Sequence, residues 1–268
     1  MKKRFASLAA AALLTASLFT GCGAGAKSDL ESIREKGQLN IGITLFDPMN
    51  YYDPENPKKL IGFDTQMAEA VCEKLGVEPN FIVIDWEKKI IELKSNNIDC
   101  IWNGLSILDD LKESVDYSDP YSANMQVCVV KKENLDKYKD LASMSSAKLV
   151  AESESAGHKT ILTDENLKKG SFTPVLSQQD TLLEVKSGTA DVAVIDAVMA
   201  FATVGEGTSF EDLAVVPGIE LSKEEYGVGF RKGSDLTAEV NKALKELTED
   251  GTVAALAEKY PSVLVTLG

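Results

Sequence analysis

The sequence is poor in the side chains that build metal and redox centres. Its 268 residues include one histidine, His158, and four cysteines, none of which forms a CxxC pair. A zinc site needs several such ligands and a redox dithiol needs two neighbouring thiols. We therefore expect neither a metal nor a cofactor. Cys72, Cys100 and Cys128 lie in apolar segments, where a buried side chain is expected rather than a reactive thiol.

Positive charge is also scarce. The chain has 28 Lys and Arg against 42 Asp and Glu, a net charge of −14. So acidic a surface repels phosphate backbones, and no basic stripe offsets it, which excludes nucleic acid as the expected partner. A hydrophobic content of 44% with only 8 prolines excludes a disordered chain and allows one large core or two modest ones.

The first residues are typical of an export signal. MKKRFASLAAAALLTASLFTGC begins basic and continues as an apolar run too short for a stable spanning helix. Its end resembles the lipobox of bacterial lipoproteins, in which the cysteine, here Cys22, is lipidated and becomes the mature N-terminus. The alternative is a secretory signal cleaved near Ala24 or Ala26. We expect a signal peptide over 1–21, a flexible tether over 22–28 and an extracytoplasmic protein anchored to the cell membrane through Cys22.

Hydrophobic periodicity along the mature chain switches repeatedly between two residues and about 3.6 residues. Apolar runs predict strands at 38–44, 79–85, 97–103, 125–131, 147–153, 172–178, 190–196, 213–218 and 226–232. Helical patterns occupy 62–76, 86–96, 156–170, 180–188 and 236–260. Alternating strands and helices predict an α/β fold with parallel sheets and right-handed crossovers.

One unit of this pattern occurs twice. IIELKSNNIDCIWNG and LLEVKSGTADVAVID both run from an apolar helix through a turn and an acidic residue to a buried strand with a polar tip. The repetition favours two lobes of similar plan. Ligands of such sheets bind beyond the carboxyl ends of the strands, so the tips at Asn103 to Ser106 and at Asp196 are expected to face one cleft.

Five segments resemble, in order and spacing, the amino-acid-binding extracytoplasmic solute receptors of ABC importers. They are LIGFDTQMAEAVCEKLG, IDWEKKIIELKSNNIDCIWNGLSI, VDYSDPYS, VKSGTADVAVID and KEEYGVGFRKGSDLTAEVNKALKELTEDGTVAALAEKY. The resemblance implies a two-lobe periplasmic-binding-protein-like fold (type II), each lobe a central β-sheet flanked by helices. Two hinge strands would join lobe 1, residues 29–124 plus 226–268, to lobe 2, residues 125–225, and let them close on a ligand.

The resemblance also implies ligand-binding residues in lobe 1. Phe46 and Trp86 take the places of aromatic residues that stack on the ligand; a Trp86 that only caps a helix within the core is the alternative. A strand-end loop would hold the amino and carboxylate groups of the ligand, and its places are taken by Asn103, Gly104, Leu105 and Ser106. Gly104 suits a close approach of ligand to backbone.

In lobe 2 the resemblance implies a helix start that grips a carboxylate. Ser155 and Ala156 lie there, with Glu154 in place of a glycine, and their N–H groups would face the anion. Asp196 takes the place of the aspartate that pairs with the α-amino group of the ligand. The alternative for Asp196 is a cap of the helix that begins after it.

The family pattern is broken at Leu111. Related receptors place an arginine there, five residues after the position of Ser106, to clamp the ligand carboxylate. Arg34 and Arg231, the two arginines of the mature chain, fall outside the expected cleft. Losing such a clamp in a closed site costs about 2 to 5 kcal/mol.

Two explanations of the missing arginine remain open. Another group could bind the carboxylate: Lys112, if the helix expected to start after Ser106 is rewound, or the helix start at Ser155 alone. Otherwise the ligand has no free α-carboxylate, as in an amine, which Asp47, Asp196 and the two aromatic residues would suit.

We expect a monomeric receptor that binds an amino acid or close derivative and delivers it to an ABC permease. An enzyme is the alternative from another class, because a few proteins of this fold are dehydratases that act on small carboxylic acids. The predicted lipid anchor and the missing carboxylate clamp disfavour it. His158, beside the binding turn, is expected to be a solvated surface residue.

Overall fold

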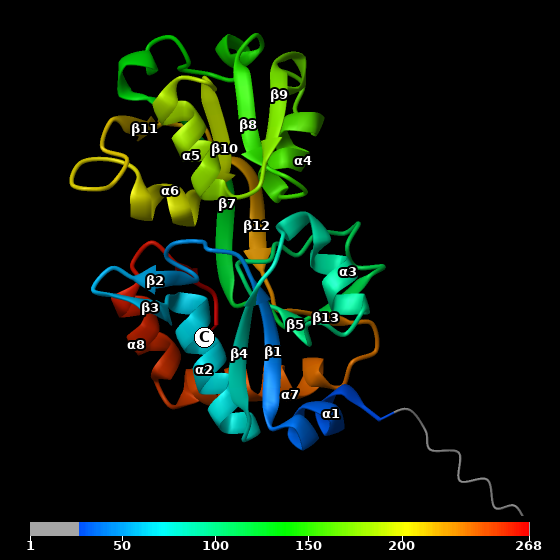
Figure 1. Ribbon diagram of the computed structural model, residues 1–268. Coiled ribbons are helices and arrows are strands. Elements are labelled where there is room, and N and C mark those ends of the chain that lie inside the picture. The colour runs from blue at the N-terminus through cyan, green and yellow to red at the C-terminus, as the bar shows by residue number, and fades with distance from the viewer. Residues whose placement is uncertain (1–26, 268) are drawn as a thin grey trace, which may run out of the picture.

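The structure is a computed structural model that describes residues 27–267. The predicted signal peptide, Cys22 and most of the predicted tether lie outside the described residues. Figure 1 shows two lobes, each with a sheet covered by helices. This is the two-lobe α/β fold expected from the sequence, and its two sheets share no strand.

Lobe 1 is built on a five-stranded sheet of order β4-β1-β5-β13-β6. Its strands are β1 (Gln38–Ile43), β4 (Glu78–Val83), β5 (Cys100–Ile101), β6 (Val115–Tyr117) and β13 (Gly229–Arg231). β1 pairs in parallel with β4 and β5, whereas β13 runs antiparallel to β5 and β6. The helices of this lobe are α1 (Asp29–Lys36), α2 (Phe63–Leu75), η1 (Trp86–Lys88), α3 (Lys89–Lys94), α7 (Leu236–Glu249) and α8 (Thr252–Lys259). A hairpin of β2 (Tyr51–Asp53) and β3 (Asn56–Ile61) lies at its edge.

Lobe 2 is built on a seven-stranded sheet centred on β7. Its strands are β7 (Ser122–Lys131), β8 (Lys148–Glu152), β9 (Ser171–Val175), β10 (Val192–Asp196), β11 (Leu213–Val215), β12 (Leu221–Tyr226) and β14 (Leu264–Val265). The helices are α4 (Ala156–Thr163), α5 (Gln178–Ser187) and α6 (Ala197–Thr203), with short 3₁₀ turns η2 (Lys132–Asn134), η3 (Ala142–Met144) and η4 (Leu167–Lys169). β8 lies between β9 and β10 and pairs in parallel with both.

Two antiparallel strands, β7 and β12, connect the lobes (Figure 1). Tyr226, the last residue of β12, pairs with Ser122 at the lobe 1 end of β7, and β14 pairs with the same end. The lobe boundary predicted between residues 124 and 125 therefore falls within β7. The one predicted between 225 and 226 falls at the last residue of β12.

Each predicted strand has a counterpart in the structure, but the predicted final helix is divided. α7 ends at Glu249 and α8 begins at Thr252, because Gly251 between them has φ +85° and breaks the helical path. The three cysteines of the described residues are buried and unpaired, as expected.

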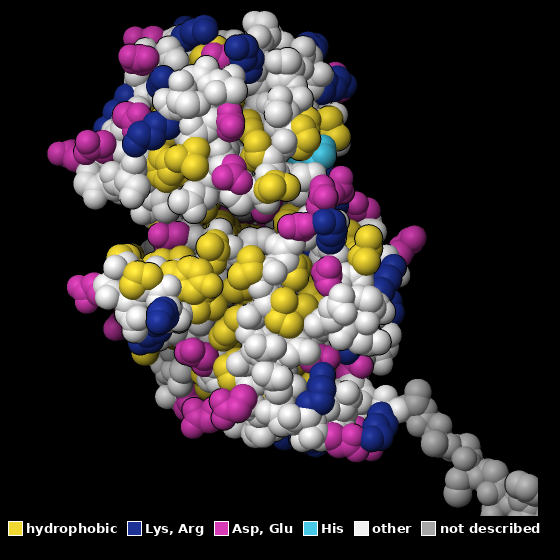
Figure 2. Space-filling view, viewed as in Figure 1, with side chains coloured by type: hydrophobic (Ala, Val, Ile, Leu, Met, Phe, Trp, Pro, Cys, Tyr) yellow, Lys and Arg dark blue, Asp and Glu magenta, His cyan; other side chains and the backbone are white. Residues whose placement is uncertain are grey.

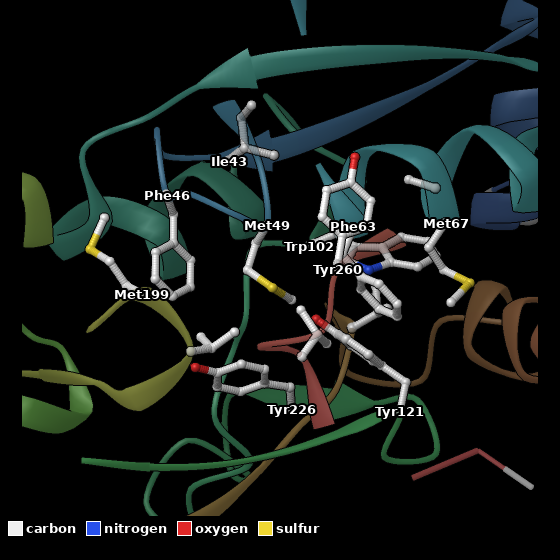
Figure 3. Close-up of a cluster of buried hydrophobic side chains, with 14 of the residues drawn as sticks. Ile43, Phe46, Met49, Phe63, Met67, Trp102, Tyr121, Met199, Tyr226 and Tyr260 are labelled. Carbon is white, nitrogen blue, oxygen red and sulfur yellow. The ribbon is translucent and has the colours of Figure 1, made fainter. Parts of the chain in front are cut away.

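A buried cluster that contains several aromatic side chains extends from lobe 1 into lobe 2. Figure 3 draws Phe46 between Met49 of lobe 1 and Met199 of lobe 2, and all three belong to one continuous buried cluster that also contains Tyr121 and Tyr226. The two lobe cores are therefore in contact in this structure, so the cleft between them is closed.

Candidate functional site

A small cavity lies where the lobes meet, at the carboxyl ends of strands from both sheets. Its volume is about 20 Å³, room for about one water molecule. It is lined by Thr44, Phe46, Trp86, Asn103, Gly104, Ser106, Glu152, Ser155, Ala156, Gln178 and Asp196. Most of the predicted site residues therefore come together at one point. Whether they contact a ligand stays a prediction.

A wider groove runs beside this cavity along the same boundary. Figure 2 shows the surface hollowed between the lobes, and the groove has a volume of about 690 Å³. Tyr52 and Leu45 line it from lobe 1, and Leu183 and Met199 line it from lobe 2. Its walls are largely apolar, whereas the small cavity gathers buried polar and ionisable groups, which is the combination expected of a specific binding site.

The amide of Asn103 is fully occupied within lobe 1. Its Oδ1 accepts hydrogen bonds from the backbone N–H and the hydroxyl of Thr44, at 3.0 and 2.7 Å. Its Nδ2 donates to the carbonyl oxygen of Thr44 at 3.0 Å and to Oδ1 of Asn50 at 2.6 Å. A side-chain amide has two N–H protons, and Asn103 donates both of them to these partners. Asn103 therefore joins β1 to the strand-end loop rather than offering its side chain to the cavity.

The next residue, Gly104, requires glycine for two reasons. Its φ is +56°, and a Cβ at this position would lie 2.7 Å from Cε1 of Phe46. Its N–H donates a hydrogen bond of 2.7 Å to Oδ2 of Asp64, a fully buried carboxyl that also accepts from the hydroxyl of Tyr121. Burial raises the pKa of Asp64 to about 7. The N–H of Gly104 thus points into lobe 1.

Ser106 is likewise committed to a protein partner. Its hydroxyl donates a hydrogen bond of 2.6 Å to Oε2 of Glu224, which lies on the hinge strand β12. Sequence reasoning did not single out Glu224, because LSKEEY has the composition of an exposed polar segment.

The two aromatic residues line the cavity from lobe 1. Phe46 closes a tight loop in which its N–H donates to the carbonyl oxygen of Asn50 at 2.7 Å. Trp86 begins η1 and packs into a buried cluster with Leu93 and Ile98. The core role weighed as the alternative for Trp86 therefore applies, and its side chain reaches the cavity as well.

Lobe 2 supplies the start of α4. The hydroxyl of Ser155 caps the helix by accepting a hydrogen bond of 3.1 Å from the N–H of His158. The N–H groups of Ala156 and Gly157, in the first turn, have no acceptor within the helix. Glu154 has φ +57°, the left-handed conformation that suits the glycine it replaces.

His158 is not simply solvated, contrary to expectation. It is half-buried, its Nδ1 accepts a hydrogen bond of 3.0 Å from the N–H of Glu154, and its ring lies 4.7 Å from that of Phe172. The imidazole thus supports the turn that precedes α4.

Asp196 ends β10 and is surrounded by hydrogen-bond donors. Its Oδ1 accepts from Tyr226 and Gln126, both at 2.8 Å, and from Asn124; its Oδ2 accepts from Gln178. Asp196 occupies the N-cap position of α6, as the alternative role requires, but its carboxylate makes no capping hydrogen bond to the helix. Oδ2, with one protein donor, retains capacity to accept another bond.

Asp196 and Glu224 form a coupled acidic pair. Oε2 of Glu224 lies 3.4 Å from the amide nitrogens of Asn124 and Gln126, which also bond Asp196. Burial and the charge of Asp196 raise the pKa of Glu224 to about 7, and burial raises the pKa of Asp196. Two neighbouring carboxylates resist ionising together, and the larger number of donors around Asp196 favours ionisation at Asp196 over Glu224.

A third acid, Glu152, was missed by sequence reasoning. It ends β8, two residues before the predicted turn, and is 4% exposed. Its Oε1 is buried without a hydrogen-bond partner, and burial raises its pKa to about 8. The sequence signal was its place at the carboxyl end of a predicted strand.

Lys89 is a buried lysine of lobe 1 whose charge attracts Glu152. It is 3% exposed and its Nζ lies 4.6 Å from the centre of the Trp86 ring. Nζ donates to the carbonyl oxygens of Trp86 at 3.2 Å and of Glu154 at 3.0 Å. Burial lowers the pKa of Lys89 to about 8, against the attraction of Glu152.

The structure does not bring Leu105 or Leu111 to the cavity. Leu105 is buried in lobe 1 against Ile101 and Val115, and Leu111 lies half-exposed in a series of turns over 109–114. The helix expected to start after Ser106 is absent there, because successive N–H groups bond three residues back.

Lys112, the basic side chain expected as a possible substitute for the arginine, does not line the cavity, and neither do Arg34 and Arg231. Lys112 pairs with Asp109 at 2.7 Å on the surface. Arg231 pairs with Asp29 at 2.8 Å beneath the sheet, and Arg34 is exposed. Of the two routes for holding a carboxylate, the start of α4 is the one that reaches the cavity.

Residues 27–267 contain no group of His, Cys, Asp and Glu side chains arranged to hold a metal ion. Within the same range, no helix combines the length and apolar character needed to cross a membrane.

Comparison with known proteins agrees with the two-lobe fold. The chain is 29% identical over 262 residues to the arginine-binding extracellular protein ArtP of Bacillus subtilis (strain 168), which covers 96% of this chain and 98% of that protein. An amino acid ABC transporter substrate-binding protein from Streptococcus pneumoniae, solved with L-arginine bound, has a TM-score of 0.78 and 27% identity over 90% of this chain and 100% of that one. The ancestral amino acid-binding protein AncCDT-1, a precursor of cyclohexadienyl dehydratase, has a TM-score of 0.78 and 29% identity over 87% of this chain and 99% of that one.

The sequence model of the family described as bacterial extracellular solute-binding proteins, family 3, matches residues 39–262, nearly the whole described chain. The chain therefore belongs to the bacterial extracellular solute-binding proteins, family 3.

Proposed function

We propose that the protein is an extracytoplasmic receptor that binds an amino acid or close derivative between its lobes and delivers it to the permease of an ABC importer. The observation that carries the proposal is Asp196, a buried carboxylate oriented by donors from β7, α5 and β12 at the edge of the inter-lobe cavity. Relatives named as amino-acid-binding proteins support it.

In this proposal the ammonium group of the ligand binds Oδ2 of Asp196. A carboxylate, where the ligand has one, binds the first-turn N–H groups of Ala156 and Gly157, since the positive end of a helix favours an anion. Phe46 and Trp86 provide the apolar wall of the site. A ligand without a free carboxylate is the second candidate, because no arginine lines the cavity.

Binding requires the lobes to separate, since a cavity of about 20 Å³ is far smaller than an amino acid. The proposed hinge is the pair β7 and β12, with residues 29–124 and 226–268 moving against 125–225. A ligand that contacts both lobes favours the closed form by its differential affinity for that form. The closed form would then present its surface to the permease.

The cellular setting forms part of the proposal. The receptor would act as a monomer held at the outer face of the cell membrane by a lipid on Cys22. It would bind its ligand without converting it, as the names of its relatives as binding proteins support.

Thermal unfolding of ligand-stripped protein lacking residues 1–22 tests the proposal. The panel consists of amino acids, their decarboxylated amines and oligopeptides. A ligand at 1,000 times its dissociation constant adds roughly 4 kcal/mol, or about 8 to 16 °C for a chain of this size. A shift with one amino acid or amine, recovered unchanged by mass spectrometry, supports the receptor. Shifts with no amino acid and no amine would overturn it, and chemical conversion of the ligand would indicate an enzyme.

A further inference from the structure

The wall of the inter-lobe cavity contains two carboxyl groups and no cationic side chain. Glu152 and Asp196 are the last residues of β8 and β10, which are neighbouring parallel strands. Such strands lie about 4.8 Å apart, so two separate acids are presented at one edge of the sheet.

Glu152 differs from Asp196 in what surrounds it. Asp196 has four protein donors, whereas Oε1 of Glu152 has none although the side chain is almost fully buried. Lys89 attracts Glu152, yet its Nζ bonds the carbonyl oxygens of Trp86 and Glu154. An unpaired buried carboxyl oxygen is costly, and a ligand that donates to it removes the cost.

The lobe 1 side of the cavity offers few donors to a carboxylate. The hydroxyls of Thr44 and Ser106 donate to Asn103 and Glu224, and the N–H of Gly104 donates to Asp64. An anion in this cavity would face Glu152 and Asp196 of lobe 2, and no cationic side chain lines the cavity to offset them. The same place favours positive charge.

We propose that Glu152 is a binding site for a second cationic group, so that the ligand of this cleft is a small diamine without a free carboxylate. One ammonium group binds Asp196 and the other binds Glu152, with a short hydrocarbon chain against Phe46 and Trp86. This inference rests on the proposed function, in which the cleft binds a small amino compound, and it names the chemical class of that compound.

Three compounds of equal chain length test the inference by calorimetry: 1,5-diaminopentane, L-lysine and n-pentylamine. L-Lysine adds a carboxylate to the diamine, and n-pentylamine removes one ammonium group. We expect the diamine to bind at least about 10-fold more tightly than either, since a buried charge pair and a buried repulsion are each worth more than about 1.4 kcal/mol.

The variant Glu152→Gln keeps the size of the side chain and removes its ability to ionise against a bound ammonium group. It should weaken binding of 1,5-diaminopentane by about 10- to 100-fold and leave n-pentylamine within a few-fold of the wild type. Glu165→Gln makes the same chemical change in lobe 2 at a side chain that is 81% exposed. It should leave the affinity for all three compounds unchanged.

Tighter binding of L-lysine, or of any other amino acid, than of 1,5-diaminopentane would overturn the inference and leave the receptor in place. Equal binding of the diamine by wild type and Glu152→Gln would do the same. Should Glu152→Gln not fold, the wild-type comparison of diamine with L-lysine still decides. If no amine or amino acid binds, the inference and the proposed function both fail.

Discussion

Nζ of Lys89 in lobe 1 donates a hydrogen bond of 3.0 Å to the carbonyl oxygen of Glu154 in lobe 2. Two further contacts lie beside it: the hydroxyl of Ser153 donates to Glu87 at 3.2 Å, and Lys159 pairs with Asp110. All of them join the turn before α4, or α4 itself, to lobe 1. The turn before α4 in lobe 2 is thus held directly by lobe 1 in the closed form.

Replacing Lys89 with methionine should favour the open form. The change keeps an unbranched side chain one atom shorter, removes the donor to Glu154 and leaves a carbonyl oxygen without its partner, which costs about 1 to 3 kcal/mol in the closed form. Small-angle scattering of ligand-free protein should show a larger radius of gyration. Lys88→Met is the matched control. The Lys88 side chain is next in sequence to Lys89, is half-exposed, and bonds only Asp85 among the described residues. Identical scattering from Lys89→Met and the wild type would contradict the prediction.

Asp196→Ala should weaken the binding of whichever amino acid or amine stabilises the wild type. Removal of one partner of a buried charge pair costs about 2 to 5 kcal/mol, roughly 30- to several thousand-fold in affinity. Calorimetry measures the loss, and scattering should show that the ligand no longer closes the lobes. Asp212→Ala, an exposed change in the same lobe, serves as the control. Wild-type affinity in Asp196→Ala would remove this residue from the site.

The free energy of unfolding should fall as the pH rises from about 5 to about 8. Burial raises the pKa of Glu152 to about 8 and those of Glu224 and Asp64 to about 7, so the folded protein holds protons in this range that the unfolded chain has released. We expect a loss of at least about 2 kcal/mol, because one pKa unit corresponds to about 1.4 kcal/mol. Urea unfolding at pH 5, 6.5 and 8 measures it.

Glu152→Gln should flatten this pH dependence, since one of the three groups no longer titrates. Carboxyls with lowered pKa, such as Asp250 at about 2, lose their contribution only at lower pH. Stability that rises between pH 5 and 8 would show that these acids are ionised in the folded protein.

Glu154→Gly should stabilise the folded protein by about 1 kcal/mol relative to Glu154→Ala. The residue has φ +57°, where alanine pays the steric cost of a Cβ and glycine does not. Its side chain is exposed, so both variants lose little else. Thermal unfolding of the pair measures the difference, and a more stable alanine variant would show that the turn relaxes to another conformation.

Hydrophobic periodicity predicted the strands and helices whose faces are buried. β1, β8 and β10 are apolar runs between turn residues, and α2 ends at Gly76, in the left-handed conformation expected of a C-cap. β12 was missed because LSKEEY is mostly polar and half of it is exposed, so its pairing with β7 has no signature in local hydrophobicity. β14, β2 and β3 were missed for related reasons: they are short or largely exposed.

The residues of the candidate site likewise fall into those that the sequence predicted and those that only the structure revealed. Phe46, Gly104, Ser155 and Asp196 could be found by motif and by their places at strand and helix ends. Glu224 and Lys89 could not, since each lies in a charged segment of ordinary appearance. Only long-range contacts bring them to the cleft.

The sequence by itself determined which chemical groups the protein has: an acidic chain, two lobes with polar tips, and no arginine near the expected cleft. Only the tertiary structure decided which of these groups remain free. Ser106 and Gly104 are committed to Glu224 and Asp64, residues more than thirty positions away, while Glu152 is left without a partner. Hydrogen bonds are made between neighbours in space, so the unpaired groups of a site are known only once the chain has folded.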